Sequence, residues 1–374
     1  MKNPIFIVAA VVFLAANFYV GHRIYTLLPE NPLLRIATIV IVAMGTLGAP
    51  AYFLTERYLP DSVAGFFYRF GTTWLIAFIY LLLIFLLIDF GKLLNSIFRF
   101  TDPYSVSKIF RNNGITSAVI LGSVAFLLFA GYLNYRDKRR EYIRIQTEKW
   151  PTNAKPLRIV AVSDLHLGYT ISVKELRRWI ELINAENPDI VIIGGDLIDN
   201  NLRPVENASI DRELQKINAP MGVYAVPGNH EFISGIKQSE AFFQKAGIPL
   251  LRDSAVNLEN LIIIGRDDYS NRHRKDLNEI VKNSDLSKFA ILIDHQPQNL
   301  NDAERARIDF QFSGHTHNGQ IFPFSLLVNR MYELPQGYLK KGNTHFFVSS
   351  GLGIWGGKFR IGTHSEYLVV DISR

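Results

Sequence analysis

"LRIVAVSDLH", residues 157–166, is a short apolar run that ends in an aspartate and a histidine. Its length and its valine and isoleucine content are typical of a strand that is buried on both faces. Apolar runs with the same kind of polar ending recur as "DIVIIGGDLID" (189–199), "GVYAVPGNHE" (222–231), "AILIDHQP" (290–297) and "IDFQFSGHTH" (308–317). Their shared form predicts an α/β fold for residues 157–374, with one edge of the sheet lined by polar side chains.

A helix is expected between the first two of these runs. In "SVKELRRWIELINAENP" (172–188), Leu176, Ile180 and Ile183 recur at helical spacing, and Pro188 ends the pattern. Further strands are expected at "LIIIG" (261–265), "HFFVSSG" (345–351) and "EYLVVDIS" (366–373).

The polar strand ends together suggest a metal site. In α/β sheets, ligands bind outside the carboxyl ends of the strands. The chain has no cysteine, which excludes a thiolate site, and its carboxylate, amide and imidazole groups suit Mn²⁺, Fe²⁺ or Zn²⁺. The candidate ligands are too many for one tetrahedral zinc and fit two cations about 3.5–4 Å apart. These candidates are Asp164, His166, Asp196, Asn229, His295, His315 and His317.

Each motif also has an ordinary interpretation when it is taken alone. Asp164 can cap the following segment, Asp196 and Asp199 can be turn residues, and "PGNHE" can be a β-turn. All of them would then have to fall at strand ends by accident, which argues against these interpretations jointly. The histidines that lack this context are interpreted as ordinary residues: His22, His273, His345 and His364.

The first 134 residues have a different composition. Their apolar stretches, at 4–20, 33–54, 71–88 and 115–133, approach the roughly 20 residues that cross a hydrocarbon core. Buried helices of a soluble core and, for the first stretch, a cleaved signal peptide are the alternatives. We favour a bundle of four membrane helices in residues 1–134, a basic linker in 135–156 and a catalytic domain in 157–374.

Lysines and arginines near the spans orient the bundle. With four crossings, the side that holds the C-terminal half carries Lys2, Arg57, Arg69, Arg136, Lys138, Arg139, Arg140 and Arg144. The other side carries Arg23, Arg35, Lys92, Arg99, Lys108 and Arg111. The basic cluster after the last span favours a cytoplasmic catalytic domain at a bacterial inner membrane. Asp89, at the end of the third span, is interpreted as an interfacial carboxylate.

The motifs "SDLHLG", "GGDLID", "PGNHE", "IDHQP" and "SGHTHNGQ" stand in this order between residues 163 and 320. With these motifs in this order, the C-terminal half resembles the calcineurin-like metallophosphoesterase superfamily. The "GHTH" block and the later "SSGLGIWGG" (349–357) resemble its membrane-associated bacterial branch in particular. Asn318 stands where that branch usually has glycine, which bears on substrate preference rather than on metal binding.

The resemblance implies a four-layer α/β/β/α sandwich and a metal-dependent phosphohydrolase. It implies one metal on Asp164, His166, Asp196 and His317, and a second on Asp196, Asn229, His295 and His315, with Mn²⁺ favoured. It also implies that His230 is a catalytic residue that faces the substrate and is paired with Asp199. The expected reaction is hydrolysis of a phosphodiester or pyrophosphate bond by a hydroxide that bridges the metals.

The substrate is expected to be amphiphilic because the same chain carries membrane helices. "QIFPFSLLVNRMYEL" (320–334) is either a strand or helix that packs on the sheet or an apolar lip that contacts lipid tails. The expected partners are therefore the bilayer and a phosphorylated substrate. Nucleic acid is not expected, since no stripe of interleaved aromatic and basic residues is present. A non-catalytic membrane sensor or scaffold that binds a phosphorylated ligand is the alternative.

Overall fold

The computed structural model describes residues 4–374, which divide into two compact units. The first unit ends at Gly131, and the second comprises Tyr132–Arg374. Lys2, one of the charges used to orient the membrane spans, lies outside the described residues.

The described part of the first unit contains four helices that are long and apolar enough to cross a membrane. They are α1 (Pro4–Leu27), α2 (Pro32–Thr55), α3 (Asp61–Phe98) and α5 (Gly114–Arg136), whose last turn belongs to the second unit. A 3-10 turn (Glu56–Tyr58) and α4 (Pro103–Ile109) lie in the connections. The four predicted membrane helices are thus confirmed. Each helix extends beyond its apolar stretch, α3 most of all.

A buried amide joins three of these helices. The side-chain oxygen of Asn17 on α1 accepts hydrogen bonds from Thr46 of α2 and from the Trp74 indole of α3, both at 2.9 Å. A methyl group on Gly45 would lie 2.2 Å from the Trp74 ring, so glycine allows the helices to approach closely. Small residues and shared polar contacts are typical of packing between helices in lipid.

Asp89 on α3 has partners on α1. Its carboxylate lies 2.9 Å from the Arg23 guanidinium and accepts a hydrogen bond of 2.6 Å from the Tyr19 hydroxyl. The sequence suggested a carboxylate that reaches for headgroup water. The structure adds an interhelical ion pair, and pairing of this kind is typical of acids within membrane segments.

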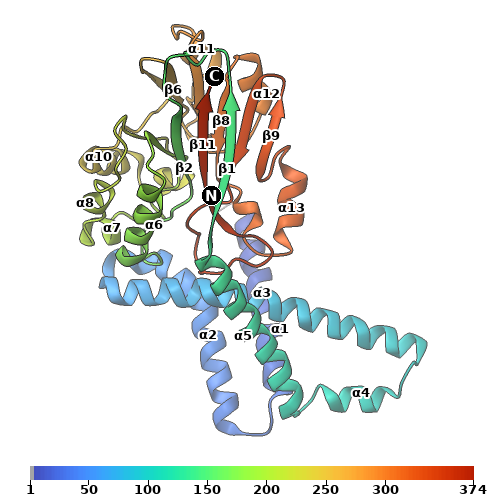
Figure 1. The fold of residues 1–374 in the computed structure, drawn as a ribbon. Coiled ribbons are helices and arrows are strands. Elements are labelled where there is room, and N and C mark those ends of the chain that lie inside the picture. The colour runs from blue at the N-terminus through green and yellow to red at the C-terminus, as the bar shows by residue number, and fades with distance from the viewer. Residues whose placement is uncertain (1–3) are drawn as a thin grey trace. The chain divides into compact units, whose positions relative to one another are not determined.

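The second unit contains two mixed β-sheets (Figure 1). The first has the order β1 (Lys138–Gln146), β11 (Ser365–Ser373), β2 (Leu157–Val162), β3 (Ile190–Ile193), β4 (Val223–Ala225). The second has the order β5 (Ser254–Asn257), β6 (Leu261–Gly265), β7 (Phe289–Ile293), β8 (Phe310–Ser313), β10 (Thr344–Val348), β9 (Gly337–Lys341). Strands β2, β3 and β4 are parallel, and so are β6, β7, β8 and β10.

The described helices of this unit that follow α5 are mostly short. They are α6 (Val173–Ala185), α7 (Arg203–Asn207), α8 (Ile210–Leu214), α9 (Asn229–Ile233), α10 (Ile236–Ala246), α11 (Leu277–Val281), α12 (Leu300–Arg305) and α13 (Phe324–Met331), with the 3-10 turn η2 (His317–Gly319). The expected amphipathic helix is α6, which begins with a capping box between Ser172 and Glu175.

Alternating side chains along the strands build the layers. On β2, Ile159 packs against the second sheet, and its neighbour Val160 packs with the residues of α6 and α10. On β7, Ile291 packs against the first sheet, and Ala290 packs with α11 and α12. Each central strand is therefore apolar on both faces. The predicted α/β/β/α sandwich is confirmed (Figure 1).

The expected linker at residues 135–156 is different in the structure. Its residues Lys138–Gln146 form β1, which pairs in parallel with β11 along its whole length. The basic sequence concealed this strand, because a charged strand at the edge of a sheet lacks the continuous apolar pattern of a central one. Strands β5 and β9, also at sheet edges, were not expected either.

Candidate metal centre

The structure brings all of the predicted site residues together at the carboxyl ends of parallel strands. Asp164 and His166 follow β2, and Asp196 and Asp199 follow β3. Asn229 and His230 open α9 after β4, His295 follows β7, and His315 and His317 follow β8. Two sheets therefore supply one site, as the shared form of the strand ends predicted.

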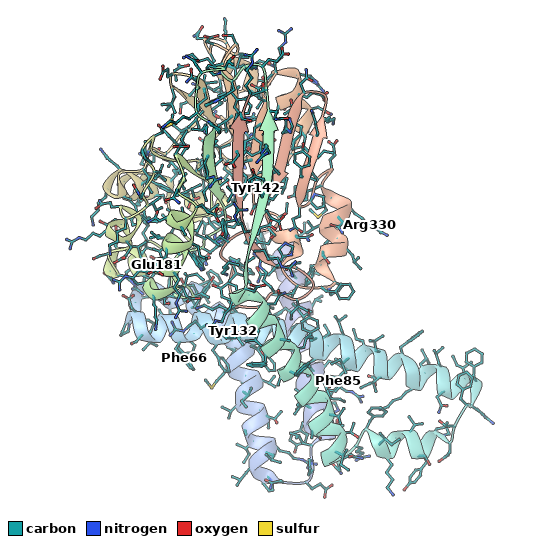
Figure 2. The ribbon with its side chains drawn as sticks, in the orientation of Figure 1. Phe66, Phe85, Tyr132, Tyr142, Glu181 and Arg330 are labelled. Atoms are coloured by element: carbon teal, nitrogen blue, oxygen red, sulfur yellow. The ribbon has the colours of Figure 1, made fainter. Side chains whose placement is uncertain are left out.

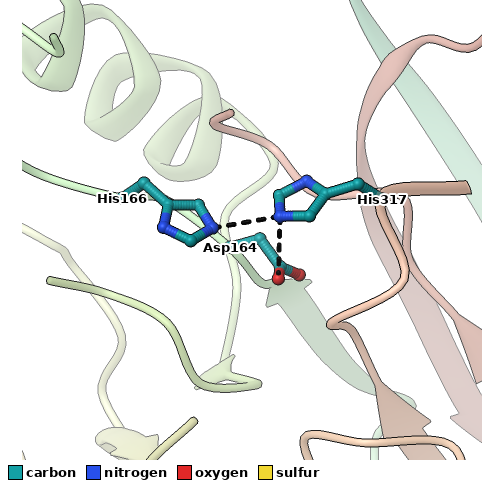
Figure 3. A group of neighbouring side chains, drawn as sticks. All are labelled: Asp164, His166 and His317. Atoms are coloured by element: carbon teal, nitrogen blue, oxygen red, sulfur yellow. Dashed lines mark hydrogen bonds and ion pairs between the residues drawn. The ribbon is translucent and has the colours of Figure 1, made fainter. Parts of the chain in front are cut away.

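One group of ligand atoms comes from both sheets (Figure 3). The Nε2 atoms of His166 and His317 lie 3.0 Å apart, and the Nε2 atom of His317 lies 3.4 Å from a carboxylate oxygen of Asp164. Asp164 and His166 are fully buried. This is a compact set of one carboxylate and two imidazoles, which suits a divalent cation.

A second group lies beside the first. The Oδ2 atom of Asp196 is 3.2 Å from Nε2 of His295, and His315 is close enough for the three ligand atoms to lie within 4.8 Å of one another. The Oδ1 atom of Asn229 lies 2.9 Å from Nδ1 of His315. The same Oδ2 atom of Asp196 is also 3.8 Å from Nε2 of His166, so this carboxylate faces both groups.

The environment of His295 fits a cation in the second group. Its Nδ1 atom lies 2.7 Å from the Gly194 carbonyl, to which it donates, and this leaves a lone pair on Nε2 of the neutral ring. Among the described residues, this buried Nε2 atom has no hydrogen-bond partner, although it faces Asp196. Burial opposes a positive ring, yet Asp196 raises the pKa of His295 well above its usual range. The carboxylate therefore favours positive charge at this position, and a bound divalent cation would supply it.

The surroundings of His315 and His317 favour the neutral ring, whereas, against the opposing effect of burial, the nearby carboxylates raise the pKa of His166. Burial, together with His295, lowers the pKa of His315 to about 4. Burial lowers the pKa of His317 well below its usual range, and the positive charges of His166 and Arg360 add to this effect. Neutral imidazoles are the form that ligates metals.

The site backbone is held in an unusual conformation. The residues of the two groups with left-handed φ angles are Asp164 (54°), His166 (47°), Asp196 (51°), His315 (71°) and His317 (47°). Such angles cost energy in residues other than glycine and cluster at functional sites. Asn318 follows with φ 48°, a region of backbone conformation that asparagine tolerates better than most residues. Its side chain also donates to Gln336 at 2.7 Å.

Two glycines allow the loops to meet. A methyl group on Gly314 would lie 1.9 Å from the Ser163 hydroxyl and 2.3 Å from the Asp164 carboxylate. A methyl group on Gly228 would lie 2.1 Å from the Asp196 carboxylate. A side chain at either position would therefore displace a candidate ligand.

The pairing of His230 with Asp199 differs from the expectation. The Nδ1 atom of His230 lies 2.6 Å from the main-chain carbonyl of Asp199 and 3.6 Å from its carboxylate. The carboxylate is 3.5 Å from Nδ1 of His166 as well. Asp199 thus orients His230 through its backbone, and its charge lies between a candidate ligand and the candidate catalytic histidine.

Glu231 is a supporting residue of the candidate site that the sequence did not reveal. It is fully buried, and its carboxylate accepts main-chain hydrogen bonds from Asp196 (3.0 Å), Ile198 (2.9 Å) and Gly228 (2.7 Å). Burial and the nearby Asp196 raise its pKa to about 7. This one side chain ties the loop after β3 to the loop after β4. "PGNHE" contained it, but nothing in the spacing indicated its role.

Arg360 is a second such residue. It is fully buried (0% exposed), and its guanidinium donates to the carbonyls of His317 (2.9 Å), Ser350 (2.5 Å) and Gly353 (3.0 Å). On the other side, Asn134 donates to the main-chain carbonyl of Arg360 at 2.8 Å. Arg360 therefore holds the main chain of His317, a candidate metal ligand. An isolated arginine in the sequence does not indicate such a role.

Comparison with known proteins identifies the family. Residues 157–319 match the calcineurin-like phosphoesterases. A metallophosphoesterase from Helicobacter pylori strain J99 is 33% identical over 277 residues, which cover 70% of this chain and 74% of that protein. The chain belongs to the calcineurin-like phosphoesterase family. A metallophosphoesterase from Aquifex aeolicus is 31% identical to it over 263 residues, 68% of this phosphoesterase and 97% of the relative.

The relatives of this phosphoesterase include membrane proteins. A protein of Danio rerio described as a transmembrane protein with a metallophosphoesterase domain is 30% identical over 313 residues, 77% of this chain and 70% of that protein. The second unit makes up only about two thirds of the chain, so the similarity extends into the membrane helices. Together with the four apolar helices, this indicates a membrane-associated phosphoesterase.

Arg360 provides a test of the support behind the ligands. We expect Arg360→Met to lower affinity for a divalent metal by about 10–100-fold, because the His317 carbonyl loses its buried donor. Titration of the metal-free protein with Mn²⁺ or Zn²⁺ against a chromophoric chelator measures this. Arg360→Lys keeps the positive charge but not the several N–H donors of the guanidinium, so its metal affinity should lie between those of the wild type and Arg360→Met. Unchanged affinity in a less stable Arg360→Met protein would limit Arg360 to a role in folding.

Proposed function

We propose that the protein is a membrane-anchored phosphoesterase with two metal ions, which hydrolyses a phosphodiester or pyrophosphate bond of an amphiphilic substrate. The observation that carries this proposal is the Asp196 carboxylate, which faces two adjacent groups of oxygen and nitrogen ligands. The first metal would be held by Asp164, His166, Asp196 and His317, and the second by Asp196, Asn229, His295 and His315. The oxygen and nitrogen donors suit Mn²⁺, Fe²⁺ or Zn²⁺.

When bound, the two cations would activate water as a nucleophile and neutralise charge on the phosphoryl oxygens. The residues of the chain contribute positioning and proton transfer. The Nδ1 atom of His230 donates to the Asp199 carbonyl, which fixes the ring and leaves Nε2 as the atom that exchanges a proton. The His230 ring packs edge-on against His166, with centroids 4.6 Å apart. We assign to Nε2 of His230 the donation of a proton to the leaving oxygen.

Two substitutions separate metal binding from turnover. We expect Asp196→Asn to bind less metal and to lose nearly all hydrolysis of an aryl phosphodiester, because it removes the shared charge. His230→Ala should keep its metal content and still lose most turnover, because only the proton donor is removed. Metal analysis and steady-state kinetics on both proteins measure this, with Asp285→Asn, a change in an exposed turn, as the control. Activity of Asp196→Asn within a few-fold of wild type, or loss of metal from His230→Ala, would contradict the assignments.

The substrate class is suggested by α13, which begins at Phe324, shortly after the η2 turn ends at Gly319. None of its residues is buried, so it is not the sheet-packing element that was one expectation for this stretch. A methyl group on Gly319 would lie 2.5 Å from the Ser325 nitrogen, so α13 packs closely on the turn that carries His317. Four apolar side chains of α13 are exposed, and so is that of the preceding Phe322: Phe322, Phe324, Leu326, Leu327 and Met331. Arg330, near the end of the helix, is exposed as well (Figure 2).

An exposed apolar surface of this kind marks an interaction site. The Tyr332 ring, just after α13, lies 6.4 Å from the His315 ring, so this surface begins beside the candidate metal centre. The same polypeptide carries membrane helices, which keep it at a bilayer. These observations support a lip that contacts the acyl chains of a phosphorylated lipid while its phosphate reaches the site.

Substitution of the lip should affect only long-chain substrates. We expect Leu326→Ser/Leu327→Ser to raise KM for a long-chain phosphodiester in mixed micelles by about tenfold or more, because two apolar contacts are lost. kcat/KM for a soluble aryl phosphodiester should be unchanged. Tyr142→Ser removes an exposed ring from β1 and serves as the control (Figure 2). Equal effects on both substrates would argue against the lip.

For the topology, we propose that the catalytic unit lies on the cytoplasmic side of a bacterial inner membrane, which the basic residues after α5 support. The chain has no cysteine, so single cysteines report accessibility without background labelling. In spheroplasts, a membrane-impermeant maleimide should label Ser107→Cys, in the connection before α5, and should label Lys237→Cys only after lysis. The reverse pattern would invert the orientation, and labelling of both in intact spheroplasts would contradict a crossing by α5.

A further inference from the structure

A pocket of about 400 Å³ lies in the second unit, separate from the metal centre. It is formed where the last membrane helix ends and β1 begins, and α6 forms its other wall. Its lining includes two aromatic and three basic side chains: Tyr135, Arg136, Lys138, Trp179 and Arg178. Aromatic and basic residues at the end of a membrane span are typical of the headgroup region of a bilayer.

Lys138 is the central cation of this pocket. Its ammonium lies 3.7 Å from the centroid of the Tyr135 ring and 5.0 Å from that of Trp179, and it donates to the Tyr135 carbonyl at 2.7 Å. An ammonium has three donors, and the rings attract its charge without accepting a conventional hydrogen bond. Burial lowers the pKa of Lys138 well below its usual range, and the positive charge of Arg360 adds to this effect. An anion in the pocket would stabilise this charge.

Two acids line the pocket, and one of them, Glu175, attracts the charge of Lys138. Glu175 is bound to the Lys358 ammonium at 2.5 Å and accepts a hydrogen bond from the Tyr135 hydroxyl at 3.1 Å. The negative charge of Glu175 is therefore compensated mainly by the Lys358 ammonium. Glu181 also lines the pocket, but it is exposed on α6 (Figure 2). The three basic residues of the lining, Arg136, Lys138 and Arg178, outnumber its two acids, Glu175 and Glu181, so the lining carries a net positive charge.

We propose that this pocket binds the phosphate headgroup of an anionic phospholipid. The ligand chemistry is a phosphate monoanion, held by Lys138 and flanked by Arg136 and Arg178. The membrane rather than the solution supplies it, because Tyr135 and Arg136 are the final residues of α5 and lie where that helix leaves the hydrocarbon. The site does not depend on the metal centre or on catalysis.

The test uses the full-length protein in nanodiscs of phosphatidylcholine with or without a minority of phosphatidylglycerol. Native mass spectrometry counts retained phosphatidylglycerol, and thermal unfolding measures its stabilising effect. We expect retention and a higher Tm with phosphatidylglycerol for the wild type. Lys138→Met keeps the aliphatic stem on the two rings and should weaken binding about tenfold, since a charged hydrogen bond is lost. The exposed Arg178→Gln, which leaves the packing intact, should weaken it as well.

Arg139→Gln is the matched control, because Arg139 is the next residue on β1, faces the other side of the strand and lies 3.3 Å from His364. It should bind phosphatidylglycerol like the wild type. An equal loss of phosphatidylglycerol binding in Arg139→Gln would mean that the lipid is attracted by general surface charge, and it would overturn the proposed binding site. An equal rise in Tm with soluble glycerol phosphate in lipid-free detergent would overturn the lipid as the source. Hydrolysis of an aryl phosphodiester by Lys138→Met should be unchanged, so this test fails or succeeds independently of the proposed catalysis.

Discussion

The catalytic unit depends on negative charge concentrated away from water. Asp164, Asp196 and Asp199 are each at most 3% exposed, and Glu231 is fully buried behind them. Carboxylates in such surroundings destabilise a fold unless cations or hydrogen bonds compensate them. Glu231 is compensated by main-chain donors of the adjacent loops. The charge on Asp196 is met in part by the neighbouring histidines, and it faces the two positions at which metal ions would complete the balance.

The same constraint explains how the loops are built. Left-handed φ angles at the candidate ligands turn their side chains inward, at an energetic cost of about 1–3 kcal/mol for each such residue. The sandwich can bear this cost because its central strands are apolar on both faces and bury three separate hydrophobic clusters. Glu231 and Arg360 then hold the strained loops by main-chain hydrogen bonds. Neither side chain belongs to the proposed ligands, yet both keep the ligands in their places.

Much of this was accessible from the sequence, for a physical reason. Strands such as β2, β3 and β7 are buried on both faces, so they appear as continuous apolar runs, and their polar ends mark the edge where ligands collect. The membrane helices were equally clear, since length and apolar composition define them. The site residues follow from both patterns together with the family motifs.

What the sequence did not reveal depends on contacts between distant segments. β1 is basic and is recognisable as a strand only through its pairing with β11. The sequence identified His230 and Asp199 but not that the pairing uses a main-chain carbonyl. The stretch that forms α13 is as apolar as a buried helix, and only the fold determines that it stays exposed. Arg360 shows no local pattern, because its partners come from three different segments.

These contacts also change where the catalytic unit begins. Asn134, in the last turn of α5, donates to the main-chain carbonyls of Arg360 (2.8 Å) and Thr363 (2.7 Å), and the Arg360 guanidinium in turn donates to the His317 carbonyl. A single residue, Arg360, thus connects Asn134 at the end of α5 to the proposed metal ligand His317. A boundary at residue 157, where the family motifs begin, would remove both this contact and the edge strand β1. The second unit therefore includes the end of α5 as a structural part, and Asn134 contributes to the support of the candidate metal centre through Arg360.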